Sequence, residues 1–418
     1  MKRKSYIKAL GGFFILCLAT LGLLSSCTKT ATYKVQFTPD YVQLVKNYDR
    51  IYPYSEGFAI VRKNDKFGYI DQQGNAVVAC RYDAVKPFVN GMAAVCVNKK
   101  WGFVNTDGKE MVPCKYDGTY FIAKRKEGLV PLQQSMSDAL MPVRKNDKWG
   151  YVNQAGVEAI PCMYQDASLF TEHLAAVCYQ GKYGFIDTNN QVVIPFQYEK
   201  AASFCHQLAP VKKGGRWGFI DKKGDVVIPF AYEYDEDMAQ YATFGLPRMF
   251  SHGLEPLADT TKQENIGYVN TQGEVVVPLG KYEIAQPFSC GLAGVANDHA
   301  KWGFVNTQGE EVIPCRFDAI MPFTEGLAPV KLGDMCGFVN TEGKVVIPCI
   351  YTNVKNFSAG LAAVCNNRKW GFINTRGEVV IPLQYSVAYP FSEGGVAQVC
   401  KNRVWGLVDT QGNDTFGE

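Results

Sequence analysis

The chain has 418 residues, of which 47% are apolar and 20% are charged, a composition typical of a folded protein. Its formal net charge is +3, but four of the 43 basic residues lie in a predicted N-terminal signal, which leaves 39 basic against 40 acidic residues. Because phosphate binding needs a concentrated basic face, this balance argues against nucleic acid as the partner.

The N-terminus predicts a secretory signal peptide over residues 1–26. Residues 2–8 are basic and residues 9–24 are apolar, the order found in signal peptides. Leu24-Ser25-Ser26-Cys27 then resembles the lipobox of bacterial lipoproteins. This resemblance implies that Cys27 becomes the lipidated first residue, with residues 27–50 as lipid attachment and tether. An uncleaved anchor or an ordinary signal peptide is the alternative.

By resemblance to known sorting signals, the absence of Asp directly after Cys27 implies an outer membrane. The expected location is therefore the bacterial cell envelope, with the protein held at a membrane by an N-terminal lipid. Which side of the membrane it occupies stays open at this point.

Residues 51–418 contain a tandem repeat. An aromatic or apolar residue followed by Gly recurs ten times, usually 34 to 36 residues apart. The glycines are Gly68, Gly102, Gly150, Gly184, Gly218, Gly267, Gly303, Gly337, Gly371 and Gly406. A fixed period of this kind predicts an array of one supersecondary unit, in which neighbouring units bury a continuous core.

The sequence predicts three short strands in each unit. Examples from different copies are Leu327–Val330 for the first, the Trp302-Gly303 segment for the second and Val226–Pro229 for the third. Runs of four to six residues rich in β-branched and aromatic residues favour strands over helices. Between the second and third runs, Asn or Asp stands three residues before a Gly, or before Asn190 in one copy. This pattern predicts a hairpin with a left-handed residue at its end. The Pro after the third run predicts a strand end or a sheet edge.

Calcium binding by these Asn and Asp residues is the alternative to turn capping. Six of the ten copies carry Asn instead of Asp. A site that depends on charge would not exchange carboxylate for amide so freely, so turn capping is favoured.

The segments KWGFINTRGEVVIP (369–382) and RWGFIDKKGDVVIP (216–229) resemble WG-repeat modules, also called KWG repeats. The resemblance covers about residues 51–412. It implies a β-rich repeat domain common in bacterial surface and lipid-anchored proteins, and it implies no particular activity.

The expected fold is mainly β, a tandem array of about ten three-stranded β-meanders in an open curved solenoid. A propeller blade needs four strands and usually 40–45 residues, and closed rings typically have four to eight blades. A propeller-like closure is kept as the alternative.

Two copies carry roughly fourteen extra residues, one insertion within about 117–141 and the other within about 233–262. Insertions in repeat arrays often lie on the binding face. The second contains an acidic and aromatic cluster, which predicts a recognition loop for a cation or a basic partner. The candidate binding residues are Tyr232, Glu233, Tyr234, Asp235, Glu236 and Asp237. A tolerated surface insertion is the alternative.

The aromatic residue before each Gly could stack on a carbohydrate, but Ile266 and Cys336 occupy the same position, so packing in the core is favoured. The cysteines predict either disulfides between neighbouring repeats or small buried side chains. Three pairs share a separation of 16 residues, namely Cys80 and Cys96, Cys162 and Cys178, and Cys349 and Cys365.

The sequence contains no catalytic triad order, HExxH, P-loop or dinucleotide motif, and no CxxC pair. It therefore predicts no enzyme, no cofactor and no metal site. The leading hypothesis is a lipid-anchored envelope protein that presents an extended β surface to a protein or glycan partner. An envelope hydrolase with a site between the two insertions and a structural spacer are the alternatives.

Overall fold

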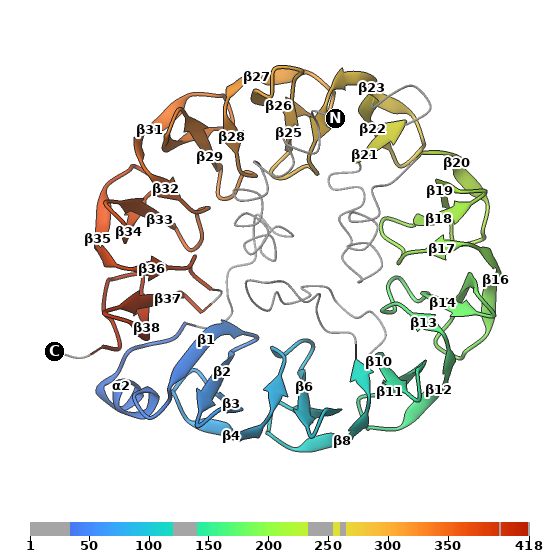
Figure 1. Ribbon diagram of the computed structural model, residues 1–418, viewed down its shortest axis with the longest axis horizontal. Helices are drawn as coiled ribbons and strands as arrows, with labels where there is room; N and C mark the ends of the chain where they lie inside the picture. Colours follow the sequence, from blue (N-terminus) through green and yellow to red (C-terminus); the bar gives the residue numbers. More distant parts are fainter. Residues whose placement is uncertain (1–33, 120–139, 233–253, 260–264, 393, 417–418) are drawn as a thin grey trace.

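The computed structural model describes residues 34–119, 140–232, 254–259, 265–392 and 394–416. Its described strands form ten antiparallel sheets, which stand around a common axis as a ring (Figure 1). We call each sheet a blade and number the blades 1 to 10 in chain order. The mainly β repeat array predicted from the sequence is confirmed.

Within a blade the strands pair in chain order. The first strands are β1 (Arg50–Ser55), β5 (Ala84–Val85), β9 (Gly118–Thr119), β13 (Asp166–Ala167), β17 (Lys200–Ala201), β24 (Ile284–Ala285), β28 (Ala319–Ile320), β32 (Asn353–Val354) and β36 (Val387–Ala388). The second strands are β2 (Phe58–Lys63), β6 (Met92–Val97), β10 (Leu140–Lys145), β14 (Ala175–Tyr179), β18 (Ala209–Lys213), β21 (Leu254–Asp259), β25 (Leu292–Ala296), β29 (Leu327–Leu332), β33 (Leu361–Asn366) and β37 (Val396–Lys401).

The third strands contain the residue pairs that end in Gly. They are β3 (Lys66–Ile70), β7 (Lys100–Asn105), β11 (Lys148–Asn153), β15 (Lys182–Ile186), β19 (Arg216–Ile220), β22 (Asn265–Asn270), β26 (Trp302–Asn306), β30 (Met335–Asn340), β34 (Lys369–Asn374) and β38 (Val404–Asp409). The fourth strands are β4 (Ala76–Tyr82), β8 (Glu110–Tyr116), β12 (Glu158–Tyr164), β16 (Val192–Tyr198), β20 (Val226–Tyr232), β23 (Val275–Tyr282), β27 (Glu311–Phe317), β31 (Val345–Tyr351) and β35 (Val379–Tyr385). They lie on the outer side of the ring (Figure 1).

The expected unit of three strands is corrected to four in eight of the ten described sheets. The strand that the sequence did not predict is the first one, which in most blades has two residues, as in Ala84–Val85. A run this short carries no readable period of two, so no sequence pattern marks it. The longer β1 is the exception.

In most blades, the Gly of the third strand lies directly under the fourth strand. In eight blades, a Cβ on that Gly would stand 2.3 to 2.6 Å from a carbonyl oxygen of the fourth strand, as at Gly303 and Ile313. The pairing register shifts at this point, between Trp302 and Phe304, which marks a bulge. Only Gly permits this approach, which explains why it recurs in every copy.

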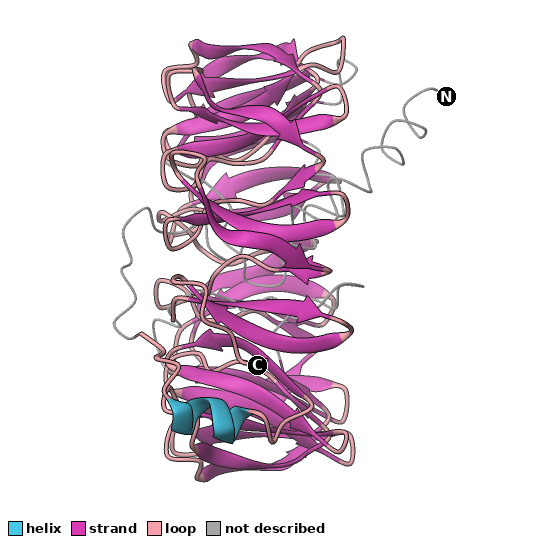
Figure 2. Ribbon diagram, turned by 90° about the vertical axis from the view of Figure 1, so that its left-hand side faces the viewer, coloured by secondary structure: helices cyan, strands magenta, loops and turns pink. Residues whose placement is uncertain are grey.

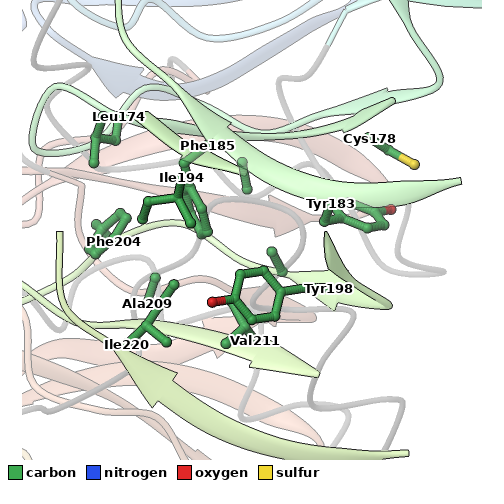
Figure 3. Packing of buried hydrophobic residues seen from close by; sticks show 12 residues of the cluster. Leu174, Cys178, Tyr183, Phe185, Ile194, Tyr198, Phe204, Ala209, Val211 and Ile220 are labelled. Carbon is green, nitrogen blue, oxygen red and sulfur yellow. The ribbon is translucent and has the colours of Figure 1, made fainter. Parts of the chain in front are cut away.

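Adjacent blades pack through pairs of aromatic rings. The Phe in the loop after the first strand lies against the aromatic residue that follows the Gly in the preceding blade, with ring centroids 4.8 to 5.0 Å apart. The pairs are Tyr69–Phe88, Tyr151–Phe170, Phe185–Phe204, Tyr268–Phe288, Phe304–Phe323, Phe338–Phe357 and Phe372–Phe391. Figure 3 shows such a core between blades 4 and 5, where Phe185, Ile194 and Phe204 lie together. The core is therefore a series of layers between blades.

The first and last blades also share a core, so the array closes. Ile51 and Ala59 of blade 1 pack in one buried cluster with Val396 and Leu407 of blade 10. The Gln398 side chain donates from Nε2 to the carbonyl of Ile51 at 2.5 Å and accepts from Arg50 Nη2 at 3.3 Å. The expected open stack therefore gives way to the alternative, a propeller-like ring.

Helix α2 (Pro39–Val45) completes this seam. Blade 10 has three strands, so it lacks a full outer strand. Tyr41 of α2 is 1% exposed, packs against Gly74 of blade 1 and bonds Tyr54 through its hydroxyl at 3.0 Å. Residues 34–49 fall within the range expected to be the tether. In the structure, part of this segment packs against the ring and belongs to its folded core. Figure 2 shows α2 at the edge of the ring near the C-terminus.

Candidate interaction surface

The alternating direction of the strands gives the ring two faces. Face A carries the loops between first and second strands and the Asn or Asp turns between third and fourth strands. Face B carries the turns between second and third strands and the connections from one blade to the next. Apart from buried side chains such as Phe88 in the loops between first and second strands, these segments lie at the surface. The two faces therefore offer the positions at which ligands can be recognised.

On face A, the Asn and Asp side chains cap their own turns. Asp71 Oδ1 accepts hydrogen bonds from the amides of Gln73 and Asn75 at 2.9 and 2.8 Å. Asn306 Oδ1 accepts from Gln308 and Glu310 at 3.0 and 2.9 Å. A carboxylate and an amide oxygen serve equally, which confirms turn capping. Within the described ranges, no group of three or more His, Cys, Asp and Glu residues could hold a metal ion.

The aromatic residues before the recurring Gly lie between blades. Trp217, Trp302 and Cys336 are buried, with Cys336 only 1% exposed, so this position is filled by packing. In four other blades the Trp at this position is half-buried and a cation lies over its ring. These contacts are Lys86–Trp101, Arg144–Trp149, Lys355–Trp370 and Arg50–Trp405. The flat sides of these Trp rings are therefore partly covered, as the packing interpretation requires.

On face B, a carboxylate joins three of the blades to the one before. Asp83 Oδ2 accepts from the amide of Asn98 at 2.7 Å, and its Oδ1 accepts from Lys66 Nζ of the preceding blade at 2.5 Å. Lys100–Asp117 and Lys301–Asp318 repeat this ion pair. The lysine hydrogen bond lowers the pKa of Asp83, Asp117 and Asp318. The shared spacing of 17 residues was the sequence signal for this contact.

A model described as "WG containing repeat" matches ten segments of the chain, which together span most of residues 46–404. The segments are 46–67, 67–101, 101–134, 149–183, 183–217, 217–236, 266–298, 302–336, 337–370 and 370–404. The chain belongs to the WG-repeat family. Each blade of the ring is thus built around one WG repeat, and in eight blades its Gly is the residue under the outer strand.

Among solved structures, the WG-repeat chain is similar to a eukaryotic initiation factor, with a TM-score of 0.47, 10% identity, and coverage of 86% of this chain and 95% of that one. It is also similar to BamB from Moraxella catarrhalis, with a TM-score of 0.32, 11% identity, and coverage of 79% and 94%. For PorZ from Porphyromonas gingivalis the TM-score is 0.25, at 10% identity and 87% and 60% coverage. A search of curated protein sequences gave no match.

The six cysteines proposed to form disulfides are free thiols in the structure. Cys80 and Cys162 point at the second strand of their own blades, with Sγ 3.8 and 3.7 Å from the carbonyls of Val61 and Val143. Their suggested partners, Cys96 and Cys178, belong to the next blades. Burial raises the pKa of Cys162 to about 11 and also raises that of Cys96. The structure thus corresponds to the alternative of small buried side chains.

The residues proposed as a recognition loop are mostly outside the described part. Tyr232 ends β20, whereas Glu233, Tyr234, Asp235, Glu236 and Asp237 fall within 233–253. The first insertion falls between β9 and β10 in the sequence. Residues 120–139 lie outside the described ranges as well. The recognition loop therefore stays a prediction.

Proposed function

We propose that the chain is a lipid-anchored interaction protein of the bacterial cell envelope, at the outer membrane, without catalytic activity. The proposal combines the ring with the lipobox at Cys27, which precedes the described residues. In the described part of the chain, no helix is long and apolar enough to cross a membrane. Attachment through a lipid on Cys27 would thus supply the membrane contact.

The observation that best supports binding is the contrast between the core and face B. The buried positions keep the same type of residue from blade to blade. The turns between second and third strands, in contrast, vary in the size and charge of their side chains. The two-residue turns read KNDK in blades 1 and 3 (63–66 and 145–148), and elsewhere VNKK (97–100), YQGK (179–182), KGGR (213–216), LGDM (332–335), NNRK (366–369) and KNRV (401–404). A spacer would gain nothing from such variation, while a recognition surface needs it.

The described N-terminal segment supports an orientation. The Val35 amide donates to the carbonyl of Gly394 at 3.1 Å, in a face A loop of blade 10. Lys34 is seven positions after Cys27, a distance of at most about 25 Å when the chain is extended. A lipid on Cys27 would hold face A towards the membrane, and face B would point away from it, towards soluble or opposing partners.

Two experiments test the proposal. Cys27→Ser should move the exported protein from the membrane fraction to the soluble fraction, because the lipid is lost. The full chain immobilised on a resin should retain a protein or a glycan from solubilised envelopes, and a ring unfolded by urea should not. Unchanged membrane association of Cys27→Ser would contradict the anchor. Failure to retain any envelope component would contradict the binding role.

A further inference from the structure

The two-residue turns of face B bind carboxylates of their own chain. Asp83 accepts from the Asn98 amide and Asp318 from the Gly333 amide, both at 2.7 Å. The same contact recurs in three other blades. These are Asp49 with Asn64, Asp117 with Asn146, and Glu199 with Gly214. In five blades, therefore, the first amide of the turn holds an Asp or Glu side chain.

Blades 9 and 10 keep this turn but lack its acid. Thr352 and Ser386 stand where the other blades have Asp or Glu. Their hydroxyls donate to the carbonyls of Cys365 and Cys400 at 2.9 and 3.0 Å and so do not occupy the turn. Among the described residues, no acceptor is found for the amides of Asn367 or Asn402. Both turns have the left-handed backbone of the acid-binding turns, with φ of 49° at Asn367 and 52° at Asn402.

The same two turns carry an unbalanced positive charge. Arg368 is the second residue of the first turn and Lys369 follows it, whereas Lys401 precedes the second turn and Arg403 is its second residue. Around these turns the sequence has no Asp or Glu from Tyr351 to Asn353 or from Val364 to Trp370, and only Glu393 from Gln384 to Trp405. Glu393 lies outside the described ranges. Within the described part of the chain, none of these four cations is in an ion pair. Lys369 is equivalent to Lys66, but the residue 17 positions later is Ser386 rather than Asp.

We propose that the turns of blades 9 and 10 form a site for two carboxylates of an acidic segment in a partner protein. The group that fills this turn in five blades is an Asp or Glu side chain, so a partner's side chain of the same kind would reproduce a contact that the fold already makes. The four cations would attract it and hold it through charge-assisted hydrogen bonds. Because the two blades are neighbours, the site takes two acidic residues of one segment. This inference rests on the proposed function and names its partner.

The test uses a fluorescein-labelled hexaglutamate peptide and the full chain, with binding followed by fluorescence anisotropy at low salt. The decisive variant is Thr352→Asp with Ser386→Asp, which restores the intrachain acid of the other blades. It should lower the affinity for hexaglutamate by roughly tenfold or more, since two charge-assisted hydrogen bonds are lost. The fold should persist, because five other blades contain the same arrangement.

A matched control changes the net charge equally at another place. Gln165 of blade 4 also replaces the acid, but blades 3 and 5 on either side have Asp117 and Glu199. Gln165→Glu with Lys182→Gln should leave hexaglutamate binding within about twofold. Equal loss in the control would overturn the proposal, because net charge alone would then explain binding. No binding by the unmodified chain, or preference of the same turns for inorganic phosphate or polygalacturonate over hexaglutamate, would also overturn it.

This outcome is independent of the lipid. A Cys27→Ser variant should bind hexaglutamate as the unmodified chain does, because the site lies on face B. If membrane association fails its test while hexaglutamate binds, only the anchor is lost. If the chain does not bind hexaglutamate but retains envelope components, the interaction role stands and the proposal that the partner presents an acidic segment is wrong.

Discussion

Substituting the Gly of one WG repeat tests the packing rule on which the ring is built. In blade 7, a Cβ at Gly303 would stand 2.3 Å from the Ile313 carbonyl oxygen and 2.7 Å from the Cys315 amide nitrogen. Both are backbone atoms, so the outer strand β27 would have to move by nearly an ångström. Overpacking of this kind costs about 1–3 kcal/mol, and the lost flexibility of Gly in the unfolded chain returns less than about 1 kcal/mol. Gly303→Ala should thus destabilise the protein by about 2 kcal/mol.

A control in the same blade separates this clash from the chemistry of the substitution. A Cβ at Gly294 would meet the ends of two side chains, Ile320 and Gln286, which can turn away. Other blades have Ala at this position, such as Ala94. Gly294→Ala should therefore change the free energy of unfolding by less than about 0.5 kcal/mol. Urea unfolding followed by circular dichroism compares the midpoints of both variants at equal slope. A Gly303→Ala midpoint no lower than that of Gly294→Ala would refute the reasoning.

Three further predictions concern the links between blades. Tyr41→Ala removes a buried ring that covers the seam, so thermal unfolding should show a loss of about 3–5 kcal/mol, and an effect below about 1 kcal/mol would mean that α2 does not support the ring. For Asp318, whose pKa is lowered by the Lys301 hydrogen bond, stability is present above the unfolded-state pKa of about 4 and is lost as pH falls through the lower folded-state pKa. The advantage of the unmodified chain over Asp318→Asn should thus be seen at pH 7 and vanish near pH 2, and a constant difference would contradict this pairing. Alkylation without reductant should modify all twelve described cysteines after unfolding and react slowly with the folded chain, because burial raises the pKa of thiols such as Cys162; protected cysteines after unfolding would indicate disulfides.

The repeat, its hairpin turn and the edge position of the Pro could be predicted because each depends on local chemistry. An Asn or Asp three residues before a Gly specifies one type of turn. A Gly between a bulky residue and an apolar run recurs from copy to copy because a Cβ does not fit at that position. The first strand could not be predicted, since two residues such as Ala84 and Val85 show no period. Without this strand, each repeat shows three strands in the sequence, one fewer than a propeller blade needs. An open stack was therefore the better expectation from the sequence.

Closure could not be read from the repeats either, because it depends on residues that differ from them. Gln398 replaces an apolar residue or Gly of the other blades (Ile60 in blade 1 and Ala, Pro or Gly elsewhere), and Tyr41 lies in a helix outside the array. The carboxylates on face B were missed for another reason. The acidic residue after the aromatic residue was visible in the sequence of several copies. Only the structure shows that Asp83, Asp117 and Asp318 each bind a lysine of the preceding blade and an amide of their own blade.

The most direct test of the closed ring is a double-mutant cycle between Arg50 and Gln398, which lie 348 residues apart in sequence and meet at the seam. The free energies of unfolding of Arg50→Ala, Gln398→Ala and the double variant give the coupling energy between the two side chains. Residues in contact typically couple by about 0.5–3 kcal/mol, and distant residues add within about 0.5 kcal/mol. Closure predicts coupling of about 1 kcal/mol. Additive effects would contradict it, because the two ends of an open array do not touch.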